Sequence, residues 1–123
     1  MMVHARAERV AGQVQKVVSG LLQRSIRDPR LAGATITGVK MTADLRIARV
    51  YFTTAAGADS VKQASDGFRS ALGFMKRRMA RELKLKYMPD LQFHYDSSID
   101  YGQHIDQLLK KINTDHDTDH SSS

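Results

Sequence analysis

One apolar stripe runs through a glycine in the middle of the chain, and this feature constrains the fold most strongly. Apolar residues recur at intervals of three and four on both sides of Gly73, at Val61, Ala64, Phe68, Leu72, Met75, Met79 and Leu83. This spacing predicts helical structure with one buried face. Glycine costs about 1 kcal/mol relative to alanine inside a helix. We therefore expect that the missing side chain of Gly73 allows either a kink in the backbone or tight packing of the helix.

The stretch that follows Gly73 is strongly basic. Up to residue 86 it contains one glutamate and six cations, namely Lys76, Arg77, Arg78, Arg81, Lys84 and Lys86. Ion pairs along the helix can neutralise few of these cations, and unpaired cations of this kind bind phosphate groups. The formal net charge of +6 over 123 residues also favours an anionic partner, most commonly nucleic acid. The competing interpretation is a solvated helix face that has no partner.

Composition excludes several classes of protein. The chain has no cysteine, so disulfides, thiolate catalysis and cysteine-bound zinc are excluded. No run of residues approaches the roughly eighteen apolar positions of a membrane span. The residues before the first helical pattern lack the apolar segment of a secretory signal. We therefore expect a cytoplasmic protein without membrane association, and the length predicts a single domain.

Hydrophobic periodicity predicts the remaining elements. A first helix of about five turns is expected over residues 10–26, and Asp28-Pro29 ends it because the residue before a proline avoids the helical region. The alternation of the first strand slips at Gly38, which predicts a β-bulge. The later elements follow from the same patterns: strands over 34–41 and 45–53 joined by a turn at 42–44, a kinked helix pair capped by Asp59 or Ser60, a third strand over 91–95 and a short last helix over 105–112.

This order of elements predicts a two-layer α+β domain. A short turn pairs the first two strands as an antiparallel hairpin, whereas the helical connection allows the second and third strands to lie parallel. We expect the helices to pack on one face of a three-stranded mixed sheet, in a domain that spans residues 1–112. Residues 113–123 contain no apolar residue, which predicts a disordered polar tail.

Several short segments, spread over residues 9–112, carry a resemblance to a known family. They are Arg9-Val10, Asp28-Pro29-Arg30-Leu31, Thr35-Ile36-Thr37, the stretches 44–51 and 85–93, Asp96-Ser97-Ser98, Gly102, Ile105 and Leu108-Leu109. In their order and spacing the chain resembles the bacterial ribosome-binding factor A family, and its element order is similar to a type II KH domain. The hallmark of that family is an Ala-x-Gly kink where other KH domains carry a Gly-x-x-Gly loop, and here it would be Ala71-Leu72-Gly73.

The resemblance implies a non-enzymatic assembly factor. Members of that family bind the small (30S) ribosomal subunit and its 16S rRNA during late maturation and rRNA processing, and leave before translation. The implied partners are therefore the small subunit, its rRNA and assembly GTPases. A monomer with no cofactor and no bound metal is expected. The alternative is a general RNA-binding KH-like module that is not tied to the ribosome.

The expected RNA contacts are the six cations after Gly73, together with Arg46 and Arg49. The last two lie on opposite faces of the expected second strand, so only the one that faces away from the helices would be freely solvated. Phe74 either stacks on a base or is turned onto the sheet by the kink. Arg30 contacts a phosphate, pairs with Asp28 or has a simple role in the turn. Ala71-Leu72-Gly73 replaces a true Gly-x-x-Gly loop, so we expect the cationic helix, rather than the kink, to bind the RNA.

Two competing functions are weaker. A hydrolase or nuclease would use His94, Asp96 and His104, but no nucleophile elbow, phosphate loop or paired carboxylate framework accompanies them. His94 should point away from the core, because Phe93 and Tyr95 point inward. A binder of anionic membranes would leave the apolar stripe unburied, yet that stripe is needed to cover the sheet. The two tail histidines four residues apart resemble a helical metal site, but a disordered tail rarely preorganises one.

Overall fold

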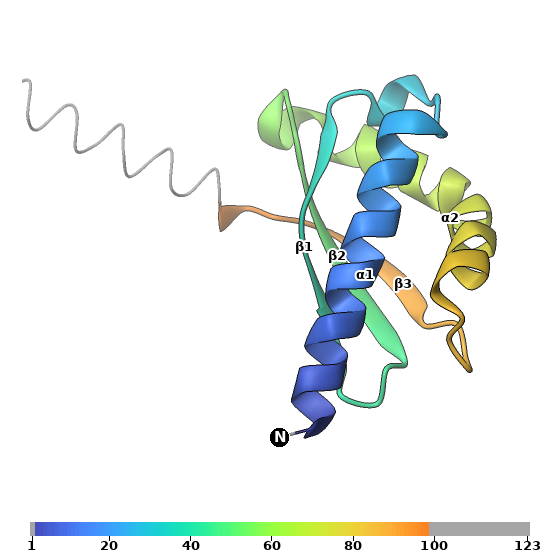
Figure 1. Ribbon diagram of the computed structural model, residues 1–123. Helices are drawn as coiled ribbons and strands as arrows, with labels where there is room; N and C mark the ends of the chain where they lie inside the picture. The colour runs from blue at the N-terminus through green and yellow to red at the C-terminus, as the bar shows by residue number, and fades with distance from the viewer. Residues whose placement is uncertain (1, 99–123) are drawn as a thin grey trace, which may run out of the picture.

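The computed structural model describes residues 2–98. Figure 1 shows the elements in chain order: α1 (Met2–Arg24), the 3₁₀ helix η1 (Pro29–Leu31), β1 (Ala34–Met41), β2 (Ile47–Thr54), the 3₁₀ helix η2 (Gly57–Ser60), α2 (Val61–Leu83) and β3 (Asp90–Tyr95). The expected last helix over 105–112, the domain boundary at 112, the tail 113–123 and His104 all lie outside the described residues.

The three strands form one mixed sheet with β2 in the centre. β1 pairs with β2 antiparallel, and β2 pairs with β3 parallel. The five-residue connection between β1 and β2 makes a hairpin, whereas α2 carries the chain back across the sheet before β3 begins. The register between β1 and β2 shifts between Ile36 and Gly38, so the predicted β-bulge is confirmed.

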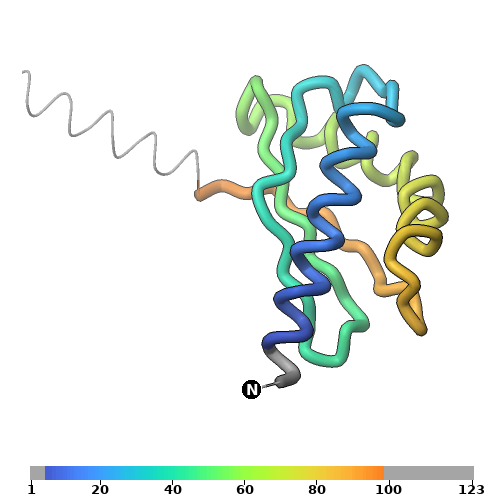
Figure 2. The backbone as a smooth tube through the Cα atoms, in the orientation of Figure 1, coloured from blue at the N-terminus to red at the C-terminus, as the bar shows by residue number. Residues whose placement is uncertain are grey.

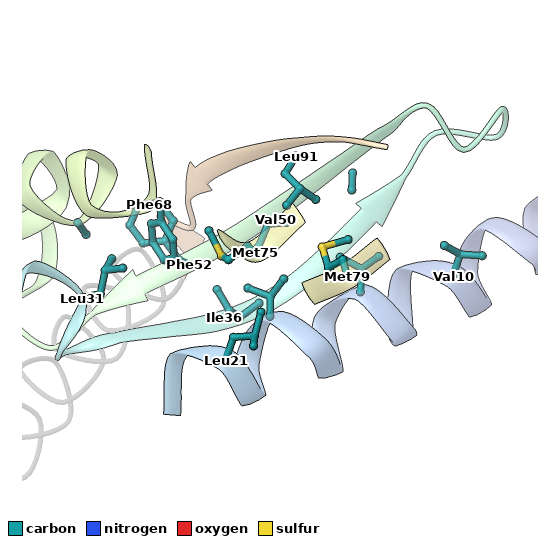
Figure 3. Packing of buried hydrophobic residues seen from close by; sticks show 14 residues of the cluster. Val10, Leu21, Leu31, Ile36, Val50, Phe52, Phe68, Met75, Met79 and Leu91 are labelled. Carbon is teal, nitrogen blue, oxygen red and sulfur yellow. The ribbon is translucent and has the colours of Figure 1, made fainter. Parts of the chain in front are cut away.

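Both helices bury their apolar faces against one side of this sheet. The strands contribute alternate residues, such as Val50 and Phe52 of β2, and α2 contributes Phe68, Met75 and Met79. Figure 3 shows these side chains meeting between the layers. The ring centroids of Phe68 and Phe93 lie 4.4 Å apart with nearly parallel planes. The predicted two-layer α+β architecture is confirmed, and it leaves the other side of the sheet without a helix in the described part of the chain.

The first helix is longer at its start and shorter at its end than predicted. It begins at Met2, and the apolar stripe extends through the buried residues Ala7 and Val10. It ends at Arg24, since the backbone N–H groups of Ser25 and Ile26 both donate to the carbonyl of Leu21. The bond from Ile26 spans five residues and departs from the helical pattern, so the helix ends before the proline takes effect.

The second strand begins at Ile47, not at Leu45. Leu45 has a φ of 63° and its N–H donates to the carbonyl of Thr42 at 2.9 Å, which closes the turn. The Asp44 carboxylate accepts from the Thr42 hydroxyl at 2.7 Å and from the Arg46 N–H at 3.1 Å. Arg46 therefore belongs to the turn, and the prediction that Arg46 and Arg49 occupy opposite faces of a strand is wrong; both side chains are exposed.

The expected helix pair is one helix. α2 continues through Ala71, Leu72 and Gly73, and Gly73 does not have a positive φ. In Figures 1 and 2 the second half of α2 runs in a different direction from the first half, so the helix bends without breaking. A single glycine retains its helical hydrogen bonds. Burial of the apolar residues before and after Gly73 offsets the low helix propensity of glycine.

The glycine that packs tightly is Gly67, not Gly73. Gly73 is exposed, and a Cβ built there would meet only the Nη1 of Arg77, at 3.3 Å. At the buried Gly67 a Cβ would lie 2.8 Å from the Cγ of Leu31. Tight packing at Gly73 was therefore the wrong interpretation. Ser60 does occupy the N-cap position of α2 as expected, but its hydroxyl donates to the carbonyl of Gly57 and caps no helical N–H.

Candidate nucleic-acid interface

The second half of α2 presents free cations on its solvent side. Met75 and Met79 are buried, so residues on the opposite side of the helix are exposed, including Arg77 and Arg81. Lys84 is also exposed and ends the helix in a left-handed conformation, with φ of 49° and ψ of 42°. Within residues 2–98, none of these three cations has a carboxylate within 4 Å. They form the cationic face of α2, a name kept here for Arg77, Arg81 and Lys84.

Two neighbouring cations are partly engaged. The Nζ of Lys76 lies 3.7 Å from the Oδ1 of Asp90 at the start of β3. The Nη2 of Arg78 lies 3.9 Å from the Oε1 of Glu82, and its guanidinium carbon lies 5.7 Å from the centroid of the Phe74 ring. Phe74 itself is half-buried and packs against the hydrophobic core. The bend of α2 thus turns this ring toward the protein, where it supports Arg78.

A separate hollow of about 630 Å³ lies where α1, the β1–β2 turn and the α2–β3 loop meet. It brings Arg46 and Lys86 together with Arg6, and two carboxylates, Asp44 and Asp90, also line it. Tyr87 is 76% exposed at this hollow, and the Nζ of Lys86 lies 5.5 Å from its ring centroid. Leu45, Leu85 and Met88 form the apolar part of its lining.

Sequence reasoning missed Arg6 and Tyr87. Arg6 falls in the part of α1 that precedes the expected start of the helix. No sequence pattern therefore indicated that it lies near the hairpin turn. Tyr87 adjoins Lys86, and an aromatic residue interleaved with cations is a recognisable nucleic-acid pattern. That adjacency could have identified it.

Arg49 lies apart from both groups. It projects from β2 on the side of the sheet opposite the helices, between Lys40 of β1 and Gln92 of β3 in register. The eight expected RNA contacts are therefore divided among three places: the bent helix α2, the hollow and the outer side of the sheet.

Arg30 serves the fold. Its Nη2 donates to the Asp28 carboxylate at 2.7 Å and to the Ser70 hydroxyl of α2 at 3.1 Å, and its Nε lies 3.0 Å from the same carboxylate. The Asp28 side chain also accepts from the Arg30 backbone N–H. The hydrogen bonds from Arg30 lower the pKa of Asp28. Of the three interpretations of Arg30, the ion pair with Asp28 is confirmed.

The candidate catalytic residues are engaged separately. His94 is exposed as predicted, and its Nε2 lies 3.4 Å from the Oε1 of Gln92. The Asp96 carboxylate accepts from the hydroxyl of Thr37 at 2.6 Å and from the backbone N–H of Ser98 at 3.0 Å. No hydrogen bond joins His94 to Asp96 in the described residues, and in that part of the chain no three His, Asp or Glu side chains gather as metal ligands would. Among residues 2–98 no helix is long and apolar enough to cross a membrane.

Comparison with known proteins identifies the family. The family model of ribosome-binding factor A matches residues 6–109. The chain belongs to the ribosome-binding factor A family. Over 107 residues it is 49% identical to the ribosome-binding factor A of Desulfatibacillum aliphaticivorans, covering 87% of each chain. Over 114 residues it is 44% identical to that of Geobacter sulfurreducens, covering 93% of this chain and 97% of the relative. The resemblance found in the sequence is confirmed.

Solved structures of ribosome-binding factor A share its fold. The solution structure of a putative member from Thermotoga maritima has a TM-score of 0.65 and 28% identity, covering 72% of this chain and 85% of that one. The crystal structure from Thermus thermophilus has a TM-score of 0.64 at 20% identity, covering 72% and 93%. A homology model of the T. thermophilus factor, fitted into a cryo-EM map of a 30S complex, has a TM-score of 0.62 at 20% identity, covering 74% and 96%.

Proposed function

We propose that this chain is a non-enzymatic assembly factor that binds the small ribosomal subunit through its 16S rRNA during late maturation and rRNA processing. It acts in the cytoplasm as a monomer and leaves before translation, with assembly GTPases as candidates for driving release. Membership of the ribosome-binding factor A family supports this proposal. So does the fitting of the T. thermophilus factor into the map of a 30S complex.

The observation that carries the proposal is the cationic face of α2. Three cations stand on the solvent side of a helix that is held rigidly by the buried residues Met75 and Met79. In the described residues no acid neutralises them, so contact with RNA phosphates releases counterions without first breaking ion pairs. A helix face also fixes the spacing of its cations, which suits a structured RNA more than a flexible partner.

The hollow extends this surface toward the hairpin turn. Lys76 lies between the two, because the carboxylate that it contacts, Asp90, lines the hollow. Three cations, Arg6, Arg46 and Lys86, outnumber the two acids that line the hollow. The exposed ring of Tyr87 offers a stacking surface for a base. We assign phosphate contacts to the cationic face and a nucleotide contact to the hollow.

The Ala71-Leu72-Gly73 segment has an indirect role in this proposal. Ala71 and Leu72 are half-buried and pack against the core, and Gly73 offers no left-handed loop of free N–H groups. We propose that the segment aims the cationic face through the bend of α2 and does not itself grip RNA.

Sedimentation of a cell lysate at low salt tests the proposal. The protein should travel with free small subunits, and with neither large subunits nor translating ribosomes. If it remains in the soluble top fraction while purified protein still binds isolated RNA, the chain is a general RNA-binding module and the ribosomal proposal fails.

A further inference from the structure

The outer side of the sheet carries an ordered arrangement of polar and aromatic residues. Pairing across the strands places Lys40, Arg49 and Gln92 in one row. The next row contains Gly38, Tyr51 and His94. Residues paired in register point to the same side of a sheet, and the alternate residues Ala48, Val50 and Phe52 are buried under the helices. Both rows therefore face away from α1 and α2.

Tyr51 and His94 form an aromatic surface at the centre of this side. Their ring centroids lie 5.8 Å apart, with an angle of 34° between the ring planes. The third member of the row is Gly38, which has no side chain, and a Cβ built there would have no atom within 4 Å. Within the described residues, no side chain therefore crowds the Gly38 position of this row, although the Nζ of Lys40 lies over the Tyr51 ring. His94 is exposed at the β3 side.

Two cations stand in the row next to the rings. The Nζ of Lys40 lies 5.9 Å from the centroid of Tyr51, and Arg49 is the register neighbour of Lys40. Neither cation has a carboxylate within 4 Å in the described part of the chain. Two acids stand nearest to the rows along the strands. Asp96 receives hydrogen bonds from Ser98 and Thr37 and only a weaker attraction from Lys40, and Asp90 lies beside Lys76.

We propose that this side of the sheet binds a short segment of single-stranded RNA, with bases stacked on Tyr51 and His94 and phosphates held by Lys40 and Arg49. The two rows are separated by about 7 Å along β2, a distance that one nucleotide spans. Every base has a π-face, so stacking on such a platform tolerates many sequences. The two cations, the half-buried Tyr51 ring and the exposed His94 ring match an anionic, aromatic strand. The inference goes beyond 30S binding and does not depend on it.

The charges and the chemistry of this face favour RNA over a protein partner. A stable protein interface needs a well-packed apolar centre, whereas the two rows contain no aliphatic side chain. A membrane surface would need apolar anchors beside the cations, and these are also missing from the two rows. The stacking contact is independent of the cationic face, since the sheet separates the two surfaces (Figure 1).

Fluorescence anisotropy with the full chain and a labelled ten-nucleotide single-stranded RNA tests this proposal. Replacing the ring in Tyr51→Ala should weaken binding about tenfold, whereas Tyr51→Phe should bind like the original chain because it keeps the ring. Arg49→Ala should weaken binding and reduce the salt dependence by about one phosphate contact. Thr53→Ala, two residues further along β2, is the matched control and should bind normally.

The result that overturns the proposal is equal affinity for the original chain, Tyr51→Ala and Arg49→Ala. The same conclusion follows if Tyr51→Phe loses as much affinity as Tyr51→Ala, since the hydroxyl and not stacking would then matter. Near-unchanged circular dichroism and melting temperature show that each variant is folded. Measuring the Tyr51→Ala effect again in an Arg77→Glu, Arg81→Glu background separates the two surfaces. If Tyr51→Ala still weakens RNA binding in this background while 30S binding is lost, the two surfaces act independently. Each proposal can then fail without the other.

Discussion

Gly67 of α2 lies directly against Leu31 of η1. A Cβ at Gly67 would come within 2.8 Å of the Leu31 Cγ and 3.0 Å of its Cδ2, and Leu31 is buried in the core. The same short helix is tied to α2 a second time, through the hydrogen bond between Arg30 and Ser70. The connection between α1 and β1 is thus held against the first half of α2, which leaves the second half free to carry the cationic face.

Gly67→Ala should destabilise the fold. Alanine gains about 1 kcal/mol of helix propensity, but inserting a methyl group against a buried leucine costs about 1–3 kcal/mol, so we expect a net loss near 1 kcal/mol. Urea unfolding measures it. Gly73→Ala is the matched control, because its Cβ would meet only the flexible end of Arg77, and it should raise the free energy of unfolding by up to about 1 kcal/mol. Equal effects of the two substitutions would contradict this account of Gly67.

Reversing two charges on the cationic face should strongly weaken subunit binding without unfolding the protein. Arg77 and Arg81 are exposed and unpaired in the described residues, so Arg77→Glu with Arg81→Glu should change the free energy of unfolding by about 0.5 kcal/mol or less. Affinity for purified 30S subunits should fall by more than about tenfold, and the slope of log affinity against log salt should fall by about two. Filter binding over a salt series measures both.

The control for that experiment changes net charge equally elsewhere. Lys16 on α1 and Lys62 in the first turn of α2 are both exposed, so Lys16→Glu with Lys62→Glu alters the total charge by the same amount. We expect this variant to keep most of its 30S affinity. If both double variants lose affinity alike, only overall charge matters and the cationic face has no specific role.

Tyr87 should matter for RNA and not for stability. It is 76% exposed, so Tyr87→Ala should change the free energy of unfolding by about 0.5 kcal/mol or less. Loss of its ring from the hollow should nevertheless weaken 30S binding about fivefold or more, as expected for a lost stacking contact. Tyr87→Phe retains the ring and should bind normally. Unchanged affinity of Tyr87→Ala would remove the hollow from the proposed RNA surface.

Asp96 should make stability depend on acid pH. Hydrogen bonds from Ser98 and Thr37 lower its pKa in the folded state from the ordinary value of 3.8. The ionised carboxylate therefore stabilises the fold fully above about that pH, and the stabilisation disappears as the pH falls through the lower folded pKa. Asp96→Asn should lower the melting temperature at pH 7, and its difference from the original chain should shrink below pH 3.8.

Asp59 provides the comparison for this pH experiment. It is exposed, so Asp59→Asn should melt at nearly the same temperature as the original chain at each pH from 7 to 3. A difference between Asp96→Asn and the original chain that stays constant over this range would show that Asp96 acts through its shape rather than its charge.

Local patterns were sufficient for the layers and the strands. The apolar stripe through Gly73 keeps its phase in α2, the alternation of β2 identifies its buried side, and the slip near Gly38 marks the bulge. Each of these depends on the period of one element, which neighbouring residues alone determine. The bounds of α1 and the start of β2 were less accurate, because a turn closed at Leu45 and two N–H groups that share the Leu21 carbonyl override intrinsic preference.

The sequence by itself determined the amphipathic helices, the mixed sheet and a surplus of cations after Gly73. Only the tertiary structure decided which cations are free, since Lys76 and Arg78 meet carboxylates while Arg77 and Arg81 do not in the described part of the chain. It also decided that Gly67 is the close contact and that Tyr51 and His94 share an open side of the sheet. Periodicity determines which side of an element is buried, but contacts between elements depend on how the layers pack, and no local pattern contains that information.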